Sequence, residues 1–309
     1  MQLDLSRFSP AERSTLQLRV LYEGAGYRKF RCSHFEEYSL YQQNERFLSD
    51  SQVITFTDLD GKLRAIKPDV TLSIAKNAQP TAGECKKYYY TEQICRPSRE
   101  SHTFSEISQM GLECIGAVGA AEQAEVVRLA LESLASLEVP TVLEVSHMGF
   151  VTGLLDVLDV PATAHARLVE LLCAKNEHEL RKAALQAGAD EAGADALCGL
   201  LTLHGPFGAT LTAAKAAAIS PAQKAALAEL LALQNALGEA GRGLQLDLSM
   251  ADEAEYYNGI VFTGYAAGIP RAVLKGGQYD YLMQRFTPGA KAIGFAMYLD
   301  ELERLAAPL

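Results

Sequence analysis

The chain has 309 residues, of which 49% are hydrophobic and 21% charged, a composition typical of a globular protein that excludes global disorder. Its formal net charge of −10 at pH 7 argues against a broad basic surface for nucleic acid. The N-terminus contains Asp4 and Arg7 where a signal peptide needs an apolar run, and no apolar segment has the length of a membrane span. We therefore expect a cytoplasmic protein that does not enter a membrane. The cysteines and histidines lack CxxC and HxxxH spacing, so we expect no metal site.

The first informative segment, residues 56–78, predicts a hairpin that turns at Asp60 and Gly61. Pro68 follows the second strand, and Asp69 and Thr71 stand where a helix is expected to begin.

Residues 86–95 and 104–116 flank a polar loop and predict a long-looped antiparallel hairpin. Because side chains alternate between the faces of a strand, Gln109, Gly111 and Glu113 share one face of the second strand, opposite an apolar face. This polar face is either the solvent side of a two-layer sheet or the floor of a pocket in which the glycine leaves room for a ligand. The pattern alone does not separate the two.

Residues of about 160–241 are rich in alanine and predict helices, one of which begins at Ser220 and Pro221. The apolar face of this helix is expected to contain Leu227, Leu230, Leu231 and Leu237. We expect one sheet domain over residues 1–309, interrupted by a mainly helical insertion at about 160–241.

Three segments complete the chain. Residues 254–265 are a β-rich run that contains Tyr256 and Tyr257. Residues 274–286 predict a glycine turn that leads into a helix, and residues 291–305 predict a strand followed by a final amphipathic helix.

In this order the segments resemble the catalytic domain of histidyl-tRNA synthetase, which has the class II aminoacyl-tRNA synthetase fold. The matching stretches are AIKPDVT (65–71), YYYTEQICR (88–96), SQMGLECIG (108–116), EYYNGIVF (255–262), GGQYDYL (276–282) and AIGFAMYLDEL (292–302). The resemblance implies an α+β fold with a six-stranded antiparallel sheet flanked by helices.

The departures from that family concern its ATP chemistry. Glu301 stands where motif 3 carries a phosphate-binding arginine, Asp252 stands where the family has a catalytic arginine, and Tyr298 replaces a glycine near the nucleotide. Further family residues are replaced by Gln278, Ser105 and the pair Cys32 and Ser33. Since a carboxylate repels phosphate where a guanidinium attracts it, we expect that the chain does not form an aminoacyl adenylate and has no catalytic residues.

The amino-acid pocket of the family is better retained. The resemblance implies that Asp69 and Thr71, with Gln109 beside them, lie near a histidine α-amino group, and that Glu113 and Tyr257 bind the imidazole. Arg96 either pairs with the ligand carboxylate or braces its loop. The predicted histidine-binding residues are Asp69, Thr71, Arg96, Gln109, Glu113, Tyr256 and Tyr257. Alternatively, these residues serve only as hydrogen-bonding partners within the sheet. We expect no cofactor.

The segment YYNGIVFTGY (256–265), reading through to GGQYDYL, is most similar to the regulatory subunits of ATP phosphoribosyltransferase, which are paralogues of histidyl-tRNA synthetase. This resemblance implies a non-catalytic chain that the short-form catalytic subunit requires for activity and for feedback inhibition by L-histidine, in the first step of histidine biosynthesis. It also implies a hetero-octamer, with class II-type dimerisation through residues of about 20–50. The chain ends shortly after motif 3, so we expect no anticodon-binding domain and no tRNA partner.

Two alternatives remain open at this point. The chain could be a divergent synthetase-like enzyme that forms an aminoacyl adenylate, or a free-standing amino-acid sensor with a different partner.

Overall fold

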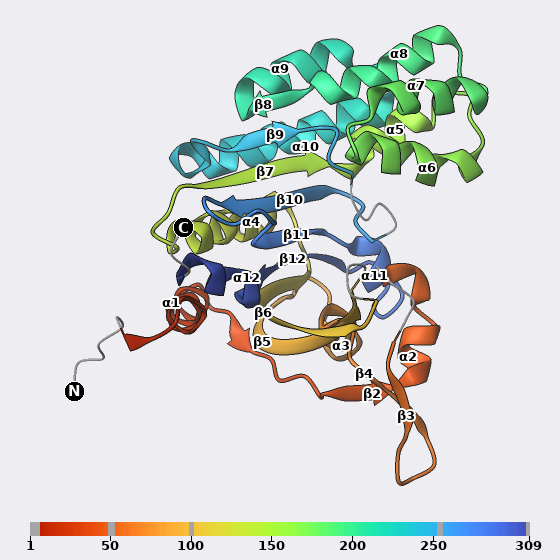
Figure 1. The fold of residues 1–309 in the computed structure, drawn as a ribbon. Helices are drawn as coiled ribbons and strands as arrows, with labels where there is room; N and C mark the ends of the chain where they lie inside the picture. Colours follow the sequence, from red (N-terminus) through yellow and green to blue (C-terminus); the bar gives the residue numbers. More distant parts are fainter. Residues whose placement is uncertain (1–6, 49–52, 99–101, 252–255, 307–309) are drawn as a thin grey trace.

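The computed structural model describes residues 7–48, 53–98, 102–251 and 256–306, and its centre is a nine-stranded sheet (Figure 1). In spatial order the strands are β1 (Arg28–Lys29), β5 (Cys85–Pro97), β6 (Phe104–Gly116), β12 (Lys291–Tyr298), β11 (Leu274–Gln278), β10 (Ile260–Ala266), β7 (Thr141–His147), β9 (Gln245–Asp247) and β8 (His204–Pro206). The six strands from β5 to β7 in this order are each antiparallel to their neighbours. This is the six-stranded antiparallel sheet expected for a class II synthetase-like α+β fold, extended by β1 at one edge and by β9 and β8 at the other.

Two long helices pack on the sheet to form the main core. α1 (Pro10–Gly24) begins with a capping box in which Ser9 and Glu12 bond reciprocally to each other's backbone. α4 (Ala120–Ala135) buries an apolar face against the sheet, and its Val126 and Leu134 belong to the same buried cluster as Leu112 and Phe295. The apolar side of the sheet is therefore covered, which leaves its polar side available for a site.

The remaining elements surround the sheet. The shorter helices are α2 (Tyr38–Gln42), α3 (Thr71–Asn77), α5 (Met148–Leu155), α11 (Asp280–Gln284) and α12 (Leu299–Leu302), with 3₁₀ turns at Glu45–Phe47, Leu200–Thr202, Gly238–Gly241 and Glu303–Ala306. A small sheet consists of β2 (Phe35–Glu37), β4 (Leu63–Ile66) and β3 (Thr55–Thr57). β3 and β4 form the predicted hairpin, which projects at the end of the molecule opposite the helical lobe (Figure 1).

The helical lobe beside β7, β9 and β8 consists of α6 (Ala162–Cys173), α7 (Glu177–Gln186), α8 (Glu191–Gly199), α9 (Phe207–Ala217) and α10 (Pro221–Leu237) (Figure 1). α10 begins as predicted, because the Ser220 hydroxyl accepts a hydrogen bond from the Gln223 backbone. The prediction for Leu231 is wrong: its side chain is 36% exposed, and Leu233 is buried instead. At 100° per residue, Leu231 falls at the flank of the stripe that is centred on Leu230 and Leu237.

The predicted glycine turn at Gly276 and Gly277 is also wrong, because both residues lie within β11 and α11 begins only at Asp280. A Cβ atom on Gly277 would lie 2.7 Å from the Tyr257 ring, and one on Gly276 would lie 2.8 Å from the Phe262 ring. The two glycines therefore serve close packing across the sheet. Among the residues that the model describes, no helix combines the length and apolar character needed to cross a membrane.

Candidate functional site

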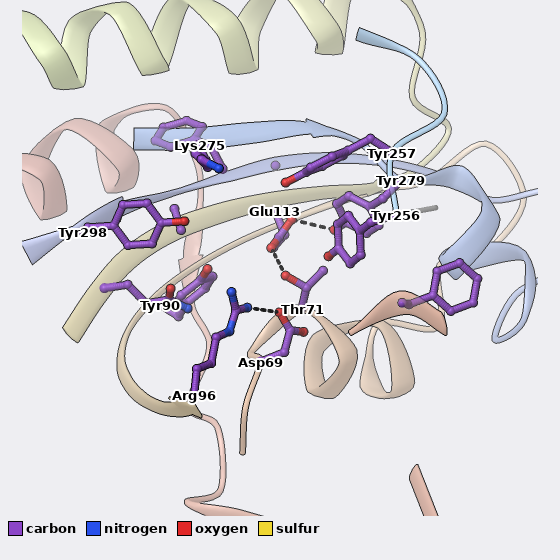
Figure 2. Close-up of a pocket in the computed structure, with 15 residues that line it drawn as sticks. Asp69, Thr71, Tyr90, Arg96, Glu113, Tyr256, Tyr257, Lys275, Tyr279 and Tyr298 are labelled. Carbon is purple, nitrogen blue, oxygen red and sulfur yellow. Dashed lines mark hydrogen bonds and ion pairs between the residues drawn. The ribbon is translucent and has the colours of Figure 1, made fainter. Parts of the chain in front are cut away.

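A polar pocket opens on the side of the main sheet that faces away from α4, and all of the predicted histidine-binding residues line it (Figure 2). These are Asp69, Thr71, Arg96, Gln109, Glu113, Tyr256 and Tyr257. On β6 the side chains alternate as predicted, with Gln109 and Glu113 in the pocket and Met110 and Leu112 in the core. The polar face of this strand is therefore the floor of a pocket and not a solvated surface.

Glu113 is the most enclosed charged group in the pocket, with a relative exposure of 2%. Its Oε1 accepts a hydrogen bond from the Thr71 hydroxyl at 2.8 Å, and its Oε2 accepts one from the Tyr279 hydroxyl at 2.6 Å. The pKa of Glu113 is raised to about 8, chiefly by burial away from water and to a smaller extent by the nearby Asp69, while the hydrogen bonds from Tyr279 and Thr71 oppose the rise. At neutral pH, Glu113 is therefore mostly protonated.

The space that Glu113 occupies depends on Gly294, its cross-strand neighbour on β12. A Cβ atom on Gly294 would collide with the Glu113 carboxylate. Of the two alternatives for this strand, the one in which Gly111 leaves room for a ligand does not hold in that detail, because a Cβ atom there would lie only 2.6 Å from the Tyr90 hydroxyl. The room left by Gly111 is filled by the ring of Tyr90 on β5 and does not admit a ligand.

Asp69 and Arg96 meet at the start of α3. The Asp69 carboxylate accepts a hydrogen bond from the Leu72 backbone at 2.8 Å and lies 3.5 Å from an Arg96 guanidinium nitrogen. Arg96 also donates to the Pro68 carbonyl at 2.8 Å. Burial raises the pKa of Asp69, and the charge of Arg96 opposes that shift. Arg96 thus braces the segment before α3 while it also lines the pocket, so the two roles considered for it are compatible.

Tyrosine rings form one wall of the pocket. The rings of Tyr256 and Tyr257 meet edge to face with centroids 4.7 Å apart. The ring centroids of Tyr256 and Tyr279 are 5.8 Å apart. Edge-to-face aromatic pairs are rigid and apolar, while their hydroxyl groups can still donate or accept hydrogen bonds. This wall can therefore hold a flat heteroaromatic ring beside the Glu113 carboxyl.

A second cavity, which we call the groove, adjoins the pocket, and Arg96, Lys275 and Tyr298 line both spaces. In this groove Glu301 forms ion pairs with Arg304 at 2.8 Å and with Arg271 at 3.7 Å. Ser105 lines the groove. Gln278 does not, because its side chain is buried and forms hydrogen bonds with Gln123 and Asp280. Asp252 lies outside the described residues.

Comparisons with known proteins agree with this architecture. The family model for histidyl-tRNA synthetase matches residues 2–302. The ATP phosphoribosyltransferase regulatory subunit of Moorella thermoacetica is 30% identical over 302 residues, which cover 93% of this chain and 76% of that protein. The protein of the same name from Anaeromyxobacter dehalogenans is 32% identical over 293 residues, which cover 92% of this chain and 83% of the relative.

The chain belongs to the family of ATP phosphoribosyltransferase regulatory subunits.

Solved structures show the same fold. A protein of Bacillus halodurans, described as an ATP phosphoribosyltransferase regulatory subunit/histidyl-tRNA synthetase, superposes with a TM-score of 0.84 at 24% identity and covers 96% of this chain and 79% of its own. A chain of the ATP phosphoribosyltransferase HisG:HisZ complex from Thermotoga maritima superposes with a TM-score of 0.72 at 20% identity, covering 94% of this chain and 97% of its own.

Several residues of the pocket were not predicted from the sequence. They are Phe47, Tyr90, Lys275, Tyr279, Gly294, Phe295, Ala296 and, as a lining residue of this pocket, Tyr298. Lys275 offered a usable signal, since it is the one charged residue of its short strand and stands directly before two glycines. Tyr279 offered none, because its contact with Glu113 joins residues 166 positions apart.

Proposed function

We propose that this chain is a non-catalytic subunit of ATP phosphoribosyltransferase that binds L-histidine in the pocket around Glu113 and transmits feedback inhibition to the catalytic subunit. Its membership of the regulatory-subunit family supports the regulatory role. The observation that supports L-histidine as the ligand is the buried Glu113 carboxyl beside a wall of tyrosine rings.

The chemistry of the pocket matches histidine group by group. A neutral imidazole has one donor and one acceptor nitrogen, which Glu113 and the Tyr257 hydroxyl can satisfy. The α-ammonium group can bind to Asp69, with the Thr71 hydroxyl and the Gln109 amide as further partners. Asp69 is only 8% exposed, so an ammonium placed there pairs with a carboxylate that water scarcely screens.

The same proposal includes the loss of adenylate formation. Activation of an amino acid needs cations against the triphosphate and the charge that develops during the reaction. In the groove, Glu301 places a carboxylate between Arg271 and Arg304, and the Tyr298 side chain stands where the family has a glycine. ATP–pyrophosphate exchange is the measurement that tests this point, and exchange stimulated by any amino acid would favour the synthetase-like alternative.

The partner in this proposal is the short-form catalytic subunit of ATP phosphoribosyltransferase, the enzyme of the first step of histidine biosynthesis. Two copies of this chain dimerise in the class II manner, and the complete complex is a hetero-octamer. The Thermotoga maritima structure is named as an ATP phosphoribosyltransferase HisG:HisZ complex, which supports association with a catalytic subunit. Histidine can inhibit such a complex only if it binds the less active arrangement more tightly. A coupling free energy of about 1–3 kcal/mol between the two sites corresponds to a change of roughly 5–150-fold in binding affinity.

The decisive experiment reconstitutes the complex from this chain and the short-form catalytic subunit encoded in the same genome. We expect this chain to be required for phosphoribosyl transfer, and L-histidine to inhibit the complex. Glu113→Gln should raise the histidine concentration needed for half-inhibition at least about tenfold without preventing assembly. Glu132→Gln, an exposed carboxylate on α4, is the matched control.

Three results would contradict the proposal. Activity of the catalytic subunit that does not depend on this chain would contradict the regulatory role. Failure of the two chains to associate would favour a free-standing amino-acid sensor. Histidine inhibition that is unchanged in Glu113→Gln would place the effector elsewhere, for example between the subunits.

A further inference from the structure

Two thiols meet at the end of the β5–β6 hairpin that lies away from its loop. The sulfur atoms of Cys85 and Cys114 are 2.9 Å apart, and both cysteines are free. In the register of the two strands, Cys85 stands opposite Gly116 and Cys114 stands opposite Lys87, so the two cysteines are diagonal neighbours on the same face of the hairpin. Because Gly116 has no side chain, the Cys85 thiol has room to lean toward Cys114. The pair lies outside the pocket and the groove.

The two thiols differ in their access to solvent and in their acidity. Cys114 is fully buried, whereas Cys85 is partly exposed at the start of β5. The hydrogen bond with Cys114 lowers the pKa of Cys85, and the Lys87 ammonium group also lowers it, while burial and the nearby carboxylates of α4 act in the opposite direction. By contrast, burial raises the pKa of Cys95 at the other end of the same strand. Since the thiolate is the reactive form of cysteine, Cys85 is suited to attack a disulfide.

We infer that Cys85 and Cys114 form a reversible disulfide by exchange with a low-molecular-weight disulfide such as oxidised glutathione. The Cys85 thiolate attacks one sulfur of that disulfide, and the product is a mixed disulfide and one small thiol, which takes the proton that Cys85 has lost. Cys114 then attacks the Cys85 sulfur, and the second small thiol leaves with the proton of Cys114. Two protein thiols are thereby oxidised, and one small disulfide is reduced to two thiols.

The bond requires the two sulfur atoms to approach from 2.9 Å to about 2.05 Å. Diagonal neighbours are farther apart along the backbone than residues that stand directly opposite each other, so the backbone at one of the cysteines has to move as well. Cys85 is the first residue of β5 and follows a turn at Ala82 and Gly83. We therefore expect the movement to be confined to the start of β5.

Incubation of the full chain in glutathione buffers of increasing oxidised fraction, followed by alkylation of the remaining thiols and peptide mass mapping, tests the inference. In the wild type we expect a peptide that links Cys85 to Cys114, with loss of these two of the six free thiols and their full recovery in dithiothreitol. In Cys114→Ser, Cys85 should carry a glutathione mixed disulfide, because no second thiol displaces it. In Cys85→Ser, the buried Cys114 should stay unmodified. Cys95→Ser removes a partly exposed thiol elsewhere on β5, and this matched control should form the link as the wild type does.

Two results would overturn the inference. A wild-type chain in which Cys85 accumulates the mixed disulfide while Cys114 stays free would show that the two sulfur atoms do not join. A wild-type chain in which both stay reduced across the buffer series would show that they form only a hydrogen bond within the fold. The wild-type result stands without the variants, whose thermal unfolding midpoints show that they are folded. Since L-histidine takes no part in this experiment, neither result bears on the proposed function.

Discussion

The hydroxyl group of Tyr279 donates a hydrogen bond of 2.6 Å to Glu113 Oε2, and both side chains are almost fully buried. The two residues come from β6 and from the segment that joins β11 to α11. This contact favours the ionised form of the carboxyl and so opposes the effect of burial, but the pKa of Glu113 is still raised to about 8. The titration of Glu113 therefore contributes to the pH dependence of the stability of the fold.

Replacing Glu113 by glutamine should change how stability depends on pH. The pKa of about 8 in the folded chain lies above the ordinary value of 4.5 for a glutamate, so Glu113 contributes stability that is fully present below about pH 4.5 and is lost as the pH rises through 8. The wild type should lose on the order of 3–5 kcal/mol of unfolding free energy between pH 5 and pH 9 that Glu113→Gln does not lose, because the glutamine does not titrate. Urea unfolding at several pH values measures this difference. A stability difference between Glu113→Gln and the wild type that does not vary with pH would contradict the raised pKa. The control Glu132→Gln should show no such pH-dependent difference from the wild type.

Binding of L-histidine at pH 7 should release protons. A pKa of about 8 leaves Glu113 mostly protonated in the empty pocket, and contact with an imidazole N–H and a nearby ammonium group favours its ionised form. We expect between about one half and one proton to be released per bound histidine, because a carboxyl with a pKa of about 8 is mostly protonated at pH 7. Titration calorimetry in two buffers of different ionisation enthalpy gives this number. Tight binding without proton release would show that the carboxyl stays protonated in the complex.

Tyr279→Phe should weaken histidine binding at neutral pH. The variant loses a hydrogen bond that lowers the pKa of Glu113, so the carboxyl should ionise only at a higher pH. We expect an affinity about tenfold lower at pH 7, and a difference that narrows as the pH rises above the new pKa. Affinities measured between pH 6 and pH 9 test this. The same weakening at every pH would point to lost packing and not to the titration of Glu113.

Gly294→Ala should disrupt the pocket, because the added Cβ atom would collide with the Glu113 carboxylate. We expect a loss of about 1–3 kcal/mol of unfolding free energy, together with a strong loss of histidine affinity. Gly199→Ala is the control, since Gly199 lies at the end of α8 with no atom within 4 Å of the added Cβ. Histidine affinity that is unchanged in Gly294→Ala would contradict the position assigned to Glu113.

Local patterns in the sequence were sufficient for much of the fold. Alternation along 104–116 separates Glu113 and Gln109 from the buried Met110 and Leu112. The Ser220 cap marks the start of α10. Both are determined within a few residues, since strand alternation and helix capping depend only on near neighbours along the chain.

The resemblance to a known family predicted which residues form the pocket, and the structure brings all seven of the predicted histidine-binding residues together. Their binding roles stay predictions, because a shared lining does not by itself identify a ligand.

What only the tertiary structure decided is which residues meet across strands that are distant in sequence. Gly294 stands opposite Glu113, Tyr90 fills the space at Gly111, and Tyr279 bonds to Glu113. The first two contacts follow from the register between β5, β6 and β12, and the third depends also on the pairing of β11 with β12. A shift of one residue in these registers would turn every side chain to the other face. The raised pKa of Glu113 has the same origin, since desolvation depends on all of the groups that enclose the carboxyl and not on its neighbours in the sequence.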